Sequence, residues 1–148
     1  MESGIEAAVR QKLAQICRSA GVTSLYAFGS RGQEALRGVL GGVSSGSRAQ
    51  ADLDLAAQTA LEVSLTAVER VRLMASLEDF FDAPRVDLVI LSEADAFLAA
   101  EAVRGELLYC EDEDRQAEEE LYYLGRAGDL ASFERARLQG VLRGELRR

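Results

Sequence analysis

Histidine is absent from this chain of 148 residues, and cysteine and proline are scarce. Without an imidazole there is no Ser-His-Asp triad, no Cys-His dyad and no histidine-ligated zinc. The two cysteines, Cys17 and Cys110, lie far apart in apolar stretches, so buried free thiols are expected rather than a disulfide, as in a reducing cytoplasm. Any chemistry must therefore use carboxylates, hydroxyls, backbone groups and arginines.

Positive charge and long hydrophobic runs are lacking as well. The 17 Lys and Arg are outnumbered by 25 Asp and Glu, which gives a net charge of −8. Nonspecific affinity for DNA or RNA comes from basic side chains that replace phosphate counterions, so this balance argues against a nucleic acid substrate. No apolar run approaches the length of a membrane span, and no apolar signal core follows Met1. We expect a cytoplasmic protein that does not enter a membrane.

The residues that are present suit one folded domain. Hydrophobic residues make up 48% of the chain and charged residues 28%, which are ordinary values for a globular protein. Apolar runs of strand length predict strands over residues 23–28, 52–57, 85–91 and 107–110. We expect a single domain over residues 1–148, with its core at about 5–110.

Helical spacing of apolar residues fills the gaps between these runs. It predicts a helix over residues 5–20 and another that begins at Thr66, which can form a capping box with Glu69. A shorter helix follows the third strand, and C-terminal helices are expected over about 112–147, the last of them capped by Asp129. This order predicts an α/β or α+β fold, with a small mixed sheet and helices packed on one side.

A stretch rich in glycine and serine separates the first two predicted strands. Residues 29–50 are expected to form a long loop with one short helical turn near Glu34 to Arg37. Loops of this length in a compact domain are usually functional or disordered. We expect residues 38–47 to be mobile in the free protein, because they have no sustained apolar period. The loop either reaches over a ligand or is a tolerated surface insertion.

Acidic residues lie within two of the predicted strands, although strands disfavour aspartate. The second strand begins Asp52-Leu53-Asp54-Leu55, and the third contains Asp87. Because residues i and i+2 of a strand point to the same face, Asp52 and Asp54 would project together while the leucines face the core. Taken alone, this alternation favours a solvated strand face. A third carboxylate on an adjacent strand favours a site for Mg²⁺, because close carboxylates resist joint ionisation without a cation.

The first predicted strand ends in Gly29-Ser30, followed by Arg31. A tight turn there would offer free backbone N–H groups and a hydroxyl to phosphate oxygens. Gly-Ser alone often makes an ordinary turn, and Arg31 is either simply exposed or in contact with phosphate. A second Gly-Ser-Arg at residues 46–48 lies closer to Asp52 but follows no strand-like run. We therefore assign the phosphate site to the first.

The strand that ends in Gly29-Ser30, the Asp52-x-Asp54 pair and the later Asp87 resemble the motif of the DNA polymerase β-like nucleotidyltransferase superfamily. More narrowly, the chain resembles the minimal nucleotidyltransferases (MNT), small single-domain members that are antitoxin-type partners of HEPN toxins. The resemblance covers about residues 5–110 and implies the polymerase β-like fold. One departure is the spacer over 31–51, which is longer than the family pattern implies.

The resemblance also implies an activity. A nucleoside monophosphate, expected to be AMP, would pass from an NTP such as ATP to a hydroxyl, often of a tyrosine, on a HEPN-type toxin. Asp52, Asp54 and Asp87 would be the catalytic residues and would hold two Mg²⁺ ions. The residues implied to bind the nucleotide are Gly29, Ser30 and Arg31.

One alternative from another functional class remains open. The chain would then be a catalytically inactive nucleotide-binding or steric antitoxin module, which keeps the fold and blocks its partner by contact alone. The long spacer favours this alternative, and the complete set of three aspartates opposes it.

Overall fold

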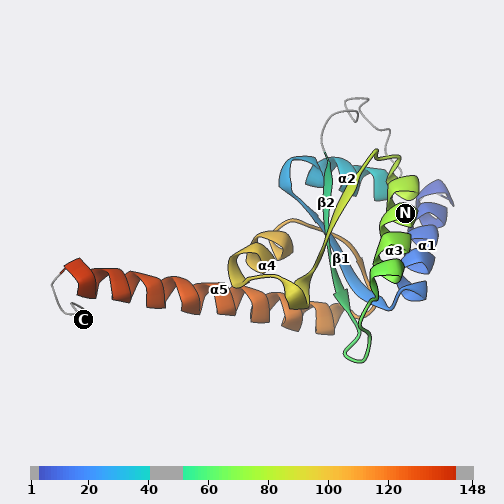
Figure 1. The fold of residues 1–148 in the computed structure, drawn as a ribbon. Coiled ribbons are helices and arrows are strands. Elements are labelled where there is room, and N and C mark those ends of the chain that lie inside the picture. Colours follow the sequence, from blue (N-terminus) through green and yellow to red (C-terminus); the bar gives the residue numbers. More distant parts are fainter. Residues whose placement is uncertain (1–3, 41–51, 143–148) are drawn as a thin grey trace.

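The computed structural model describes residues 4–40 and 52–142. These residues form a four-stranded sheet with helices on both faces (Figure 1). The strands are β1 (Val22–Phe28), β2 (Leu53–Thr59), β3 (Val86–Ile90) and β4 (Glu106–Cys110). The helices are α1 (Gly4–Ser19), α2 (Gly32–Val39), α3 (Ala67–Phe81), α4 (Ala96–Val103) and α5 (Glu113–Leu142). Two single 3-10 turns, η1 (Gly29–Arg31) and η2 (Leu91–Glu93), follow β1 and β3.

The strands run in the order β3-β2-β1-β4. β1 is antiparallel to both of its neighbours, whereas β2 is parallel to β3, so the predicted mixed sheet and the α+β class are confirmed. The helix α3 joins the parallel pair, because parallel strands need a crossover connection. In register, Asp54 of β2 lies opposite Asp87 of β3 on one side and Phe28 of β1 on the other.

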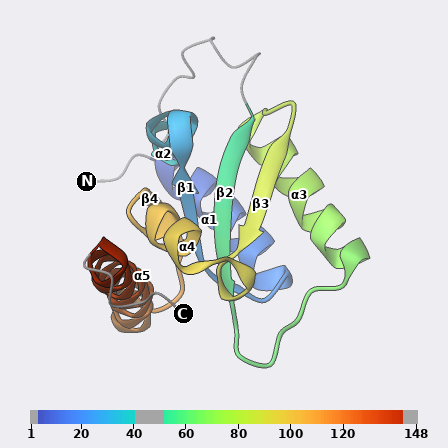
Figure 2. The ribbon, with the colours of Figure 1, turned by 60° about the vertical axis from the view of Figure 1, so that its left-hand side comes forward.

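Helices cover both faces of this sheet, so the prediction that they pack on one side is wrong (Figure 2). On one face, α1, α2 and α3 enclose a cluster that includes Leu13 and Leu55. On the other face, α4 and α5 enclose a second cluster that includes Tyr26 and Tyr123. β1 is buried along its whole length, as a central strand covered on both faces must be.

The segment that follows β1 is helical and not a loop. η1 and α2 come directly after the strand, and Ala35 and Val39 are buried. The short helical turn expected near Glu34 to Arg37 is confirmed, and it is longer than expected, because residues 33–37 contain good helix formers. Most of the stretch that was expected to be mobile lies at 41–51, outside the described residues.

The C-terminal part of the fold is one helix of 30 residues, α5, and the predicted start of a new helix at Asp129 is wrong. Neither Gly128 nor Asp129 ends α5, because each costs a helix no more than about 1 kcal/mol and keeps its backbone N–H. The first part of α5 packs against α4 and buries Tyr123 and Ala127. The far end projects away from the sheet (Figure 1), and Phe133 there is 64% exposed.

Two local predictions are confirmed. At the start of α3 the Glu69 N–H donates to Thr66 Oγ1 (3.1 Å), and the Thr66 N–H donates to Glu69 Oε1 (2.8 Å), which completes the capping box. Cys17 and Cys110 are free thiols as predicted, and burial raises the pKa of Cys17 to about 12. Cys110 is only half-buried, so for this residue the predicted burial is wrong.

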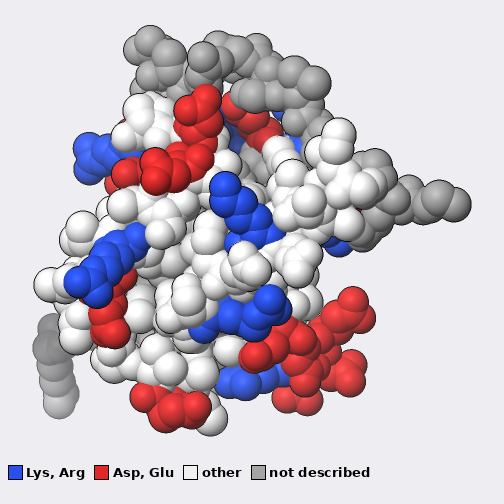
Figure 3. Space-filling model, turned by 90° about the vertical axis from the view of Figure 1, so that its right-hand side faces the viewer, with Lys and Arg blue, Asp and Glu red and all other residues white. Residues whose placement is uncertain are grey.

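The surface carries charges of both signs. On the side of the molecule that holds α1 and α3, basic and acidic side chains are interspersed, and the residues drawn there form no continuous basic patch (Figure 3). Within 4–40 and 52–142, no helix combines the length and the apolar character that a membrane span requires.

Candidate functional site

The parallel pairing of β2 with β3 brings Asp54 and Asp87 side by side. Leu53 and Leu55, the neighbours of Asp54 in sequence, are 1% and 0% exposed. Their burial on one face of the sheet turns the Asp54 carboxylate toward the other face. Asp52 immediately precedes β2 and is exposed, while Asp54 and Asp87 are half-buried.

The electrostatics of Asp54 reflect how close the acidic side chains are. The pKa of the Asp54 carboxyl is raised, first by burial and then by the negative charges of Asp87, Asp52 and Glu101. Burial and like charge both disfavour the ionised form of a carboxyl group. A bound cation would oppose both effects, so this end of the sheet is suited to hold positive charge.

Arg85, at the residue before β3, already supplies some of that charge. Its Nε lies 3.5 Å from Asp87 Oδ1 and 3.8 Å from Asp52 Oδ2. The Arg85 side chain is 69% exposed, so each of these ion pairs is weak. Nowhere in the described ranges do three acidic or thiol side chains stand together as a ready metal site. A divalent ion at the aspartates would therefore require side chains to turn, and Arg85 would have to release them.

Gly29 lets the end of β1 approach Asp54 closely. Its φ is 74°, a conformation that L side chains rarely adopt, and a Cβ at this position would lie 2.7 Å from Asp54 Oδ2. Glycine is thus required by the backbone and by the neighbouring carboxylate. Ser30 follows in η1 and is exposed, at the start of a helical segment whose first N–H groups have no partner within the helix.

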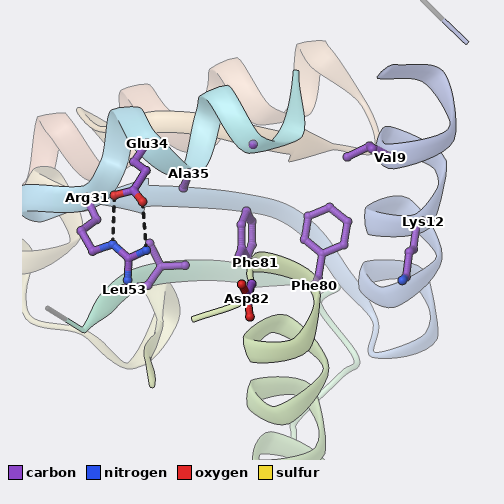
Figure 4. Close-up of a pocket in the computed structure, with 10 residues that line it drawn as sticks. Val9, Lys12, Arg31, Glu34, Ala35, Leu53, Phe80, Phe81 and Asp82 are labelled. Atoms are coloured by element: carbon purple, nitrogen blue, oxygen red, sulfur yellow. Dashed lines mark hydrogen bonds and ion pairs between the residues drawn. The ribbon is translucent and has the colours of Figure 1, made fainter. Parts of the chain in front are cut away.

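The structure does not bring Arg31 to the same place. Arg31 is 8% exposed, and its guanidinium donates to Glu34 from Nε to Oε1 and from Nη2 to Oε2, both at 3.2 Å (Figure 4). It lines a cavity together with Leu53, whose side chain faces away from the carboxylates. The structure therefore gathers Gly29, the three aspartates and the adjacent Ser30, and it separates Arg31 from them.

Two residues near the carboxylates were missed by sequence reasoning. Arg85 had a signal, because it stands two positions before Asp87 and residues at that spacing share a strand face. Glu101 had none, since it reaches the Asp54 environment from α4 only through tertiary packing.

Comparison with protein families finds a match over most of the chain. The family model described as "Polymerase beta, Nucleotidyltransferase" matches residues 11–114, a range that contains all four strands and every site residue named above. No curated protein matches the chain.

Several solved structures share the fold. A crystal structure of a mutant toxin-antitoxin MntA-HpeT aligns with a TM-score of 0.63 at 20% identity, over 90% of this chain and 98% of that one. A toxin-antitoxin crystal structure with AMP-PNP aligns with a TM-score of 0.62 at 22% identity, over 90% and 98%. The tri-AMPylated Shewanella oneidensis HEPN toxin in complex with MNT antitoxin gives a TM-score of 0.61 at 19% identity, over 93% and 98%. At such identities the likeness establishes the fold, which is the polymerase β-like fold implied by the sequence motif.

Proposed function

Because this chain belongs to the polymerase beta nucleotidyltransferase family, we propose that it transfers AMP from ATP to a hydroxyl group of a HEPN-type toxin and thereby acts as its antitoxin. The observation that carries this proposal is the pairing of Asp54 with Asp87 across β2 and β3, with Gly29 in contact distance of the same carboxylate. A steric antitoxin that binds no cation would gain nothing from placing the carboxylates of Asp54 and Asp87 side by side, because like charges repel.

The donor set of this site fits Mg²⁺ carrying a nucleotide. Asp52, Asp54 and Asp87 offer hard carboxylate oxygens. Burial and the nearby negative charges raise the pKa of the Asp54 carboxyl, and a bound cation would favour its ionised form. We assign two Mg²⁺ ions to these three residues. When bound, the ions would neutralise charge on the triphosphate and on the departing pyrophosphate.

The protein's own groups then have distinct roles. Ser30 and the first N–H groups of η1 would hold the outer phosphates at the end of β1. The oxygen of the acceptor hydroxyl would attack the α-phosphorus as the bond to pyrophosphate breaks, and Asp87 would accept the proton of that hydroxyl. Arg31 is given no role toward the nucleotide, because Glu34 holds its guanidinium on the other side of Leu53.

The proposed acceptor is a protein and not a nucleic acid. The net charge of −8 opposes a broad contact with phosphate backbones. Relatives with the same fold include an MNT antitoxin in complex with a tri-AMPylated HEPN toxin and a toxin-antitoxin with AMP-PNP. These relatives support AMP as the transferred group and a HEPN-type toxin as the partner.

Intact-mass spectrometry of the co-expressed partner tests this proposal. We expect the partner to be heavier by one or more AMP groups, and we expect the increment to vanish with Asp52→Asn. Asp129→Asn, the same substitution on exposed α5, should leave the increment in place. A partner that is bound and inhibited but never gains mass would reject transferase activity and establish the steric antitoxin instead.

A further inference from the structure

A cavity of about 300 Å³ is lined by Leu53 of β2 and by the helices that cover the same face of the sheet (Figure 4). Asp54 faces the other side of the sheet, because it is adjacent to Leu53 in the strand. α1, η1, α2 and the end of α3 contribute to its lining, and Leu53 contributes from β2. The proposed transferase does not use this cavity. Its lining nevertheless includes Arg31, which follows Ser30, and Leu53, which stands between Asp52 and Asp54. An occupant would therefore contact the two segments that carry the proposed site residues.

Aromatic and aliphatic side chains give the cavity an apolar surface. Phe80 and Phe81 from the end of α3 lie edge to face, with ring centroids 4.8 Å apart, and both are half-buried. Val9 and Ala35 add aliphatic surface from α1 and α2. Aromatic rings arranged in this way accept another planar ring by stacking or by edge contact.

Four charged side chains line the cavity, two of each sign: Lys12, Arg31, Glu34 and Asp82. Arg31 and Glu34 neutralise each other through the paired contacts at 3.2 Å, and Asp82 at the end of α3 has an interaction of its own. Lys12 on α1 is exposed, and no residue within 4–40 or 52–142 forms an ion pair with it. A negatively charged group on the ligand could pair with the Lys12 ammonium group.

We propose that this cavity is a binding site for a small planar aromatic anion, held by the Phe80 and Phe81 rings and by the Lys12 ammonium group, and separate from the nucleotide site. The volume suits a ligand of one or two fused rings rather than a macromolecule, since small-molecule sites begin at about 300 Å³. Its position against Arg31 and Leu53 makes it an effector site for the end of the sheet that carries Asp52 and Asp54. The effector role rests on the proposed function, whereas the binding site itself does not.

Fluorescence titration with 8-anilinonaphthalene-1-sulfonate, an aromatic anion whose two fused naphthalene rings are planar, tests the site directly. We expect saturable binding of one probe per chain that is weakened about tenfold, or 1.4 kcal/mol, by Lys12→Glu and by Phe81→Ala. The matched variants are Arg135→Glu and Phe133→Ala on α5, which should change the affinity less than twofold. If Phe133→Ala abolished binding instead, the probe would be on the exposed face of α5 and the proposal would be wrong.

Two further measurements test the proposal. The first distinguishes the contribution of charge from that of hydrophobic contact, and the second distinguishes this cavity from the nucleotide site. N-phenyl-1-naphthylamine has the same rings without the sulfonate, so Lys12→Glu should leave its affinity within twofold, whereas Phe81→Ala should weaken it. Lys12→Gln provides a milder change if Lys12→Glu lowers the melting temperature. Magnesium and ATP should not displace the anionic probe, and Asp52→Asn should not affect it. Displacement by ATP would mean that the cavity is the nucleotide site and would overturn the proposal, while the transferase activity would stand.

Discussion

At the scale of single residues, the carboxylate site is a balance of charges. Asp54 is disfavoured in its ionised form by burial and by Asp87, Asp52 and Glu101, while Arg85 reaches two of these acids at 3.5 and 3.8 Å. Arg85 thus stabilises the protein when no divalent ion is bound and competes with that ion for the same oxygens. Substitutions of Arg85 and of Asp54 should therefore have different effects on ion binding and on stability.

Replacing Arg85 by glutamine should tighten divalent-ion binding. Loss of the competing guanidinium should raise the Mn²⁺ affinity about threefold, since exposed ion pairs contribute about 0.2–1 kcal/mol. The melting temperature of the metal-free variant should fall by about 1–2 °C. Free Mn²⁺, counted by electron paramagnetic resonance, gives the affinity, and Arg72→Gln on the surface of α3 is the matched control. Unchanged or weaker Mn²⁺ binding would show that Arg85 does not compete with the ion.

Replacing Asp54 by asparagine should abolish transfer and yet stabilise the metal-free protein. Because the pKa of the folded carboxyl is raised above its ordinary 3.8, the folded state holds this proton more strongly than the unfolded state. The protonated Asp54 carboxyl therefore contributes stability that is fully present below pH 3.8 and is lost as the pH rises through the raised pKa. Asp54→Asn should therefore melt about 1–2 °C higher than wild type at pH 7.5, after allowance for solvent screening.

The pH dependence supplies the check on this interpretation. The advantage of Asp54→Asn in calorimetry should shrink as the pH is lowered toward 3.8. An advantage that is the same at pH 4 and pH 7.5 would assign the effect to packing and not to charge. Asp95→Asn would not serve as a control, because Asp95 accepts the Leu98 N–H as the N-cap of α4.

At the scale of elements, replacing glycine by alanine should have opposite effects on stability within a helix and in a turn. Gly128 lies within α5, and a Cβ there would meet nothing within 4 Å. Gly128→Ala should stabilise the protein by about 0.5–1 kcal/mol, because alanine loses less backbone freedom in a helix. Thermal unfolding followed by circular dichroism at 222 nm measures this. A loss of stability would indicate that α5 ends at Gly128 in solution and that a second helix starts at Asp129.

Gly29→Ala should have the reverse effect. Its φ of 74° and the 2.7 Å approach of a Cβ to Asp54 Oδ2 mean that alanine would strain the turn and displace the carboxylate. We expect a loss of about 1–3 kcal/mol in stability. If magnesium and ATP raise the melting temperature of the wild type, as the proposed function requires, Gly29→Ala should lose that shift. Gly128→Ala is the matched control and should keep that shift.

The elements also show what the sequence could and could not predict. Strand alternation placed Leu53 and Leu55 in the core and Asp54 on the opposite face, and the capping box fixed the start of α3, because these signals are local. The Arg31–Glu34 pair is also local, three residues apart, but it forms only because the segment after β1 is helical. The approach of Glu101 to Asp54 and the packing of α4 and α5 on the second face of the sheet depend on contacts between distant segments. Such contacts leave no periodic trace in one sequence, which is also why helices on both faces of the sheet were not foreseen.

At the scale of the whole molecule, stability should be unevenly distributed. β1 is buried along its whole length between two layers of helices, whereas the part of α5 after Ala127 has only Gly140 buried among its described residues. Hydrogen exchange should therefore be slowest in β1 and, among the described helices, fastest in residues 130–142 of α5. Mass spectrometry of deuterium uptake checks this, and equal protection of the two regions would show that another surface covers the end of α5.

The parallel pairing of β2 with β3 has a consequence for biosynthesis. Asp54 meets Asp87 only after α3 has crossed over and β3 has docked, so a nascent chain that ends before Ile90 has no complete carboxylate set. The antiparallel pair of β1 and β2 can form earlier and already brings Gly29 to Asp54. Translation thus delivers the turn with Asp52 and Asp54 first and Asp87 later. A ribosome-bound chain would have to expose residues well beyond β3 before it could act on any partner made beside it.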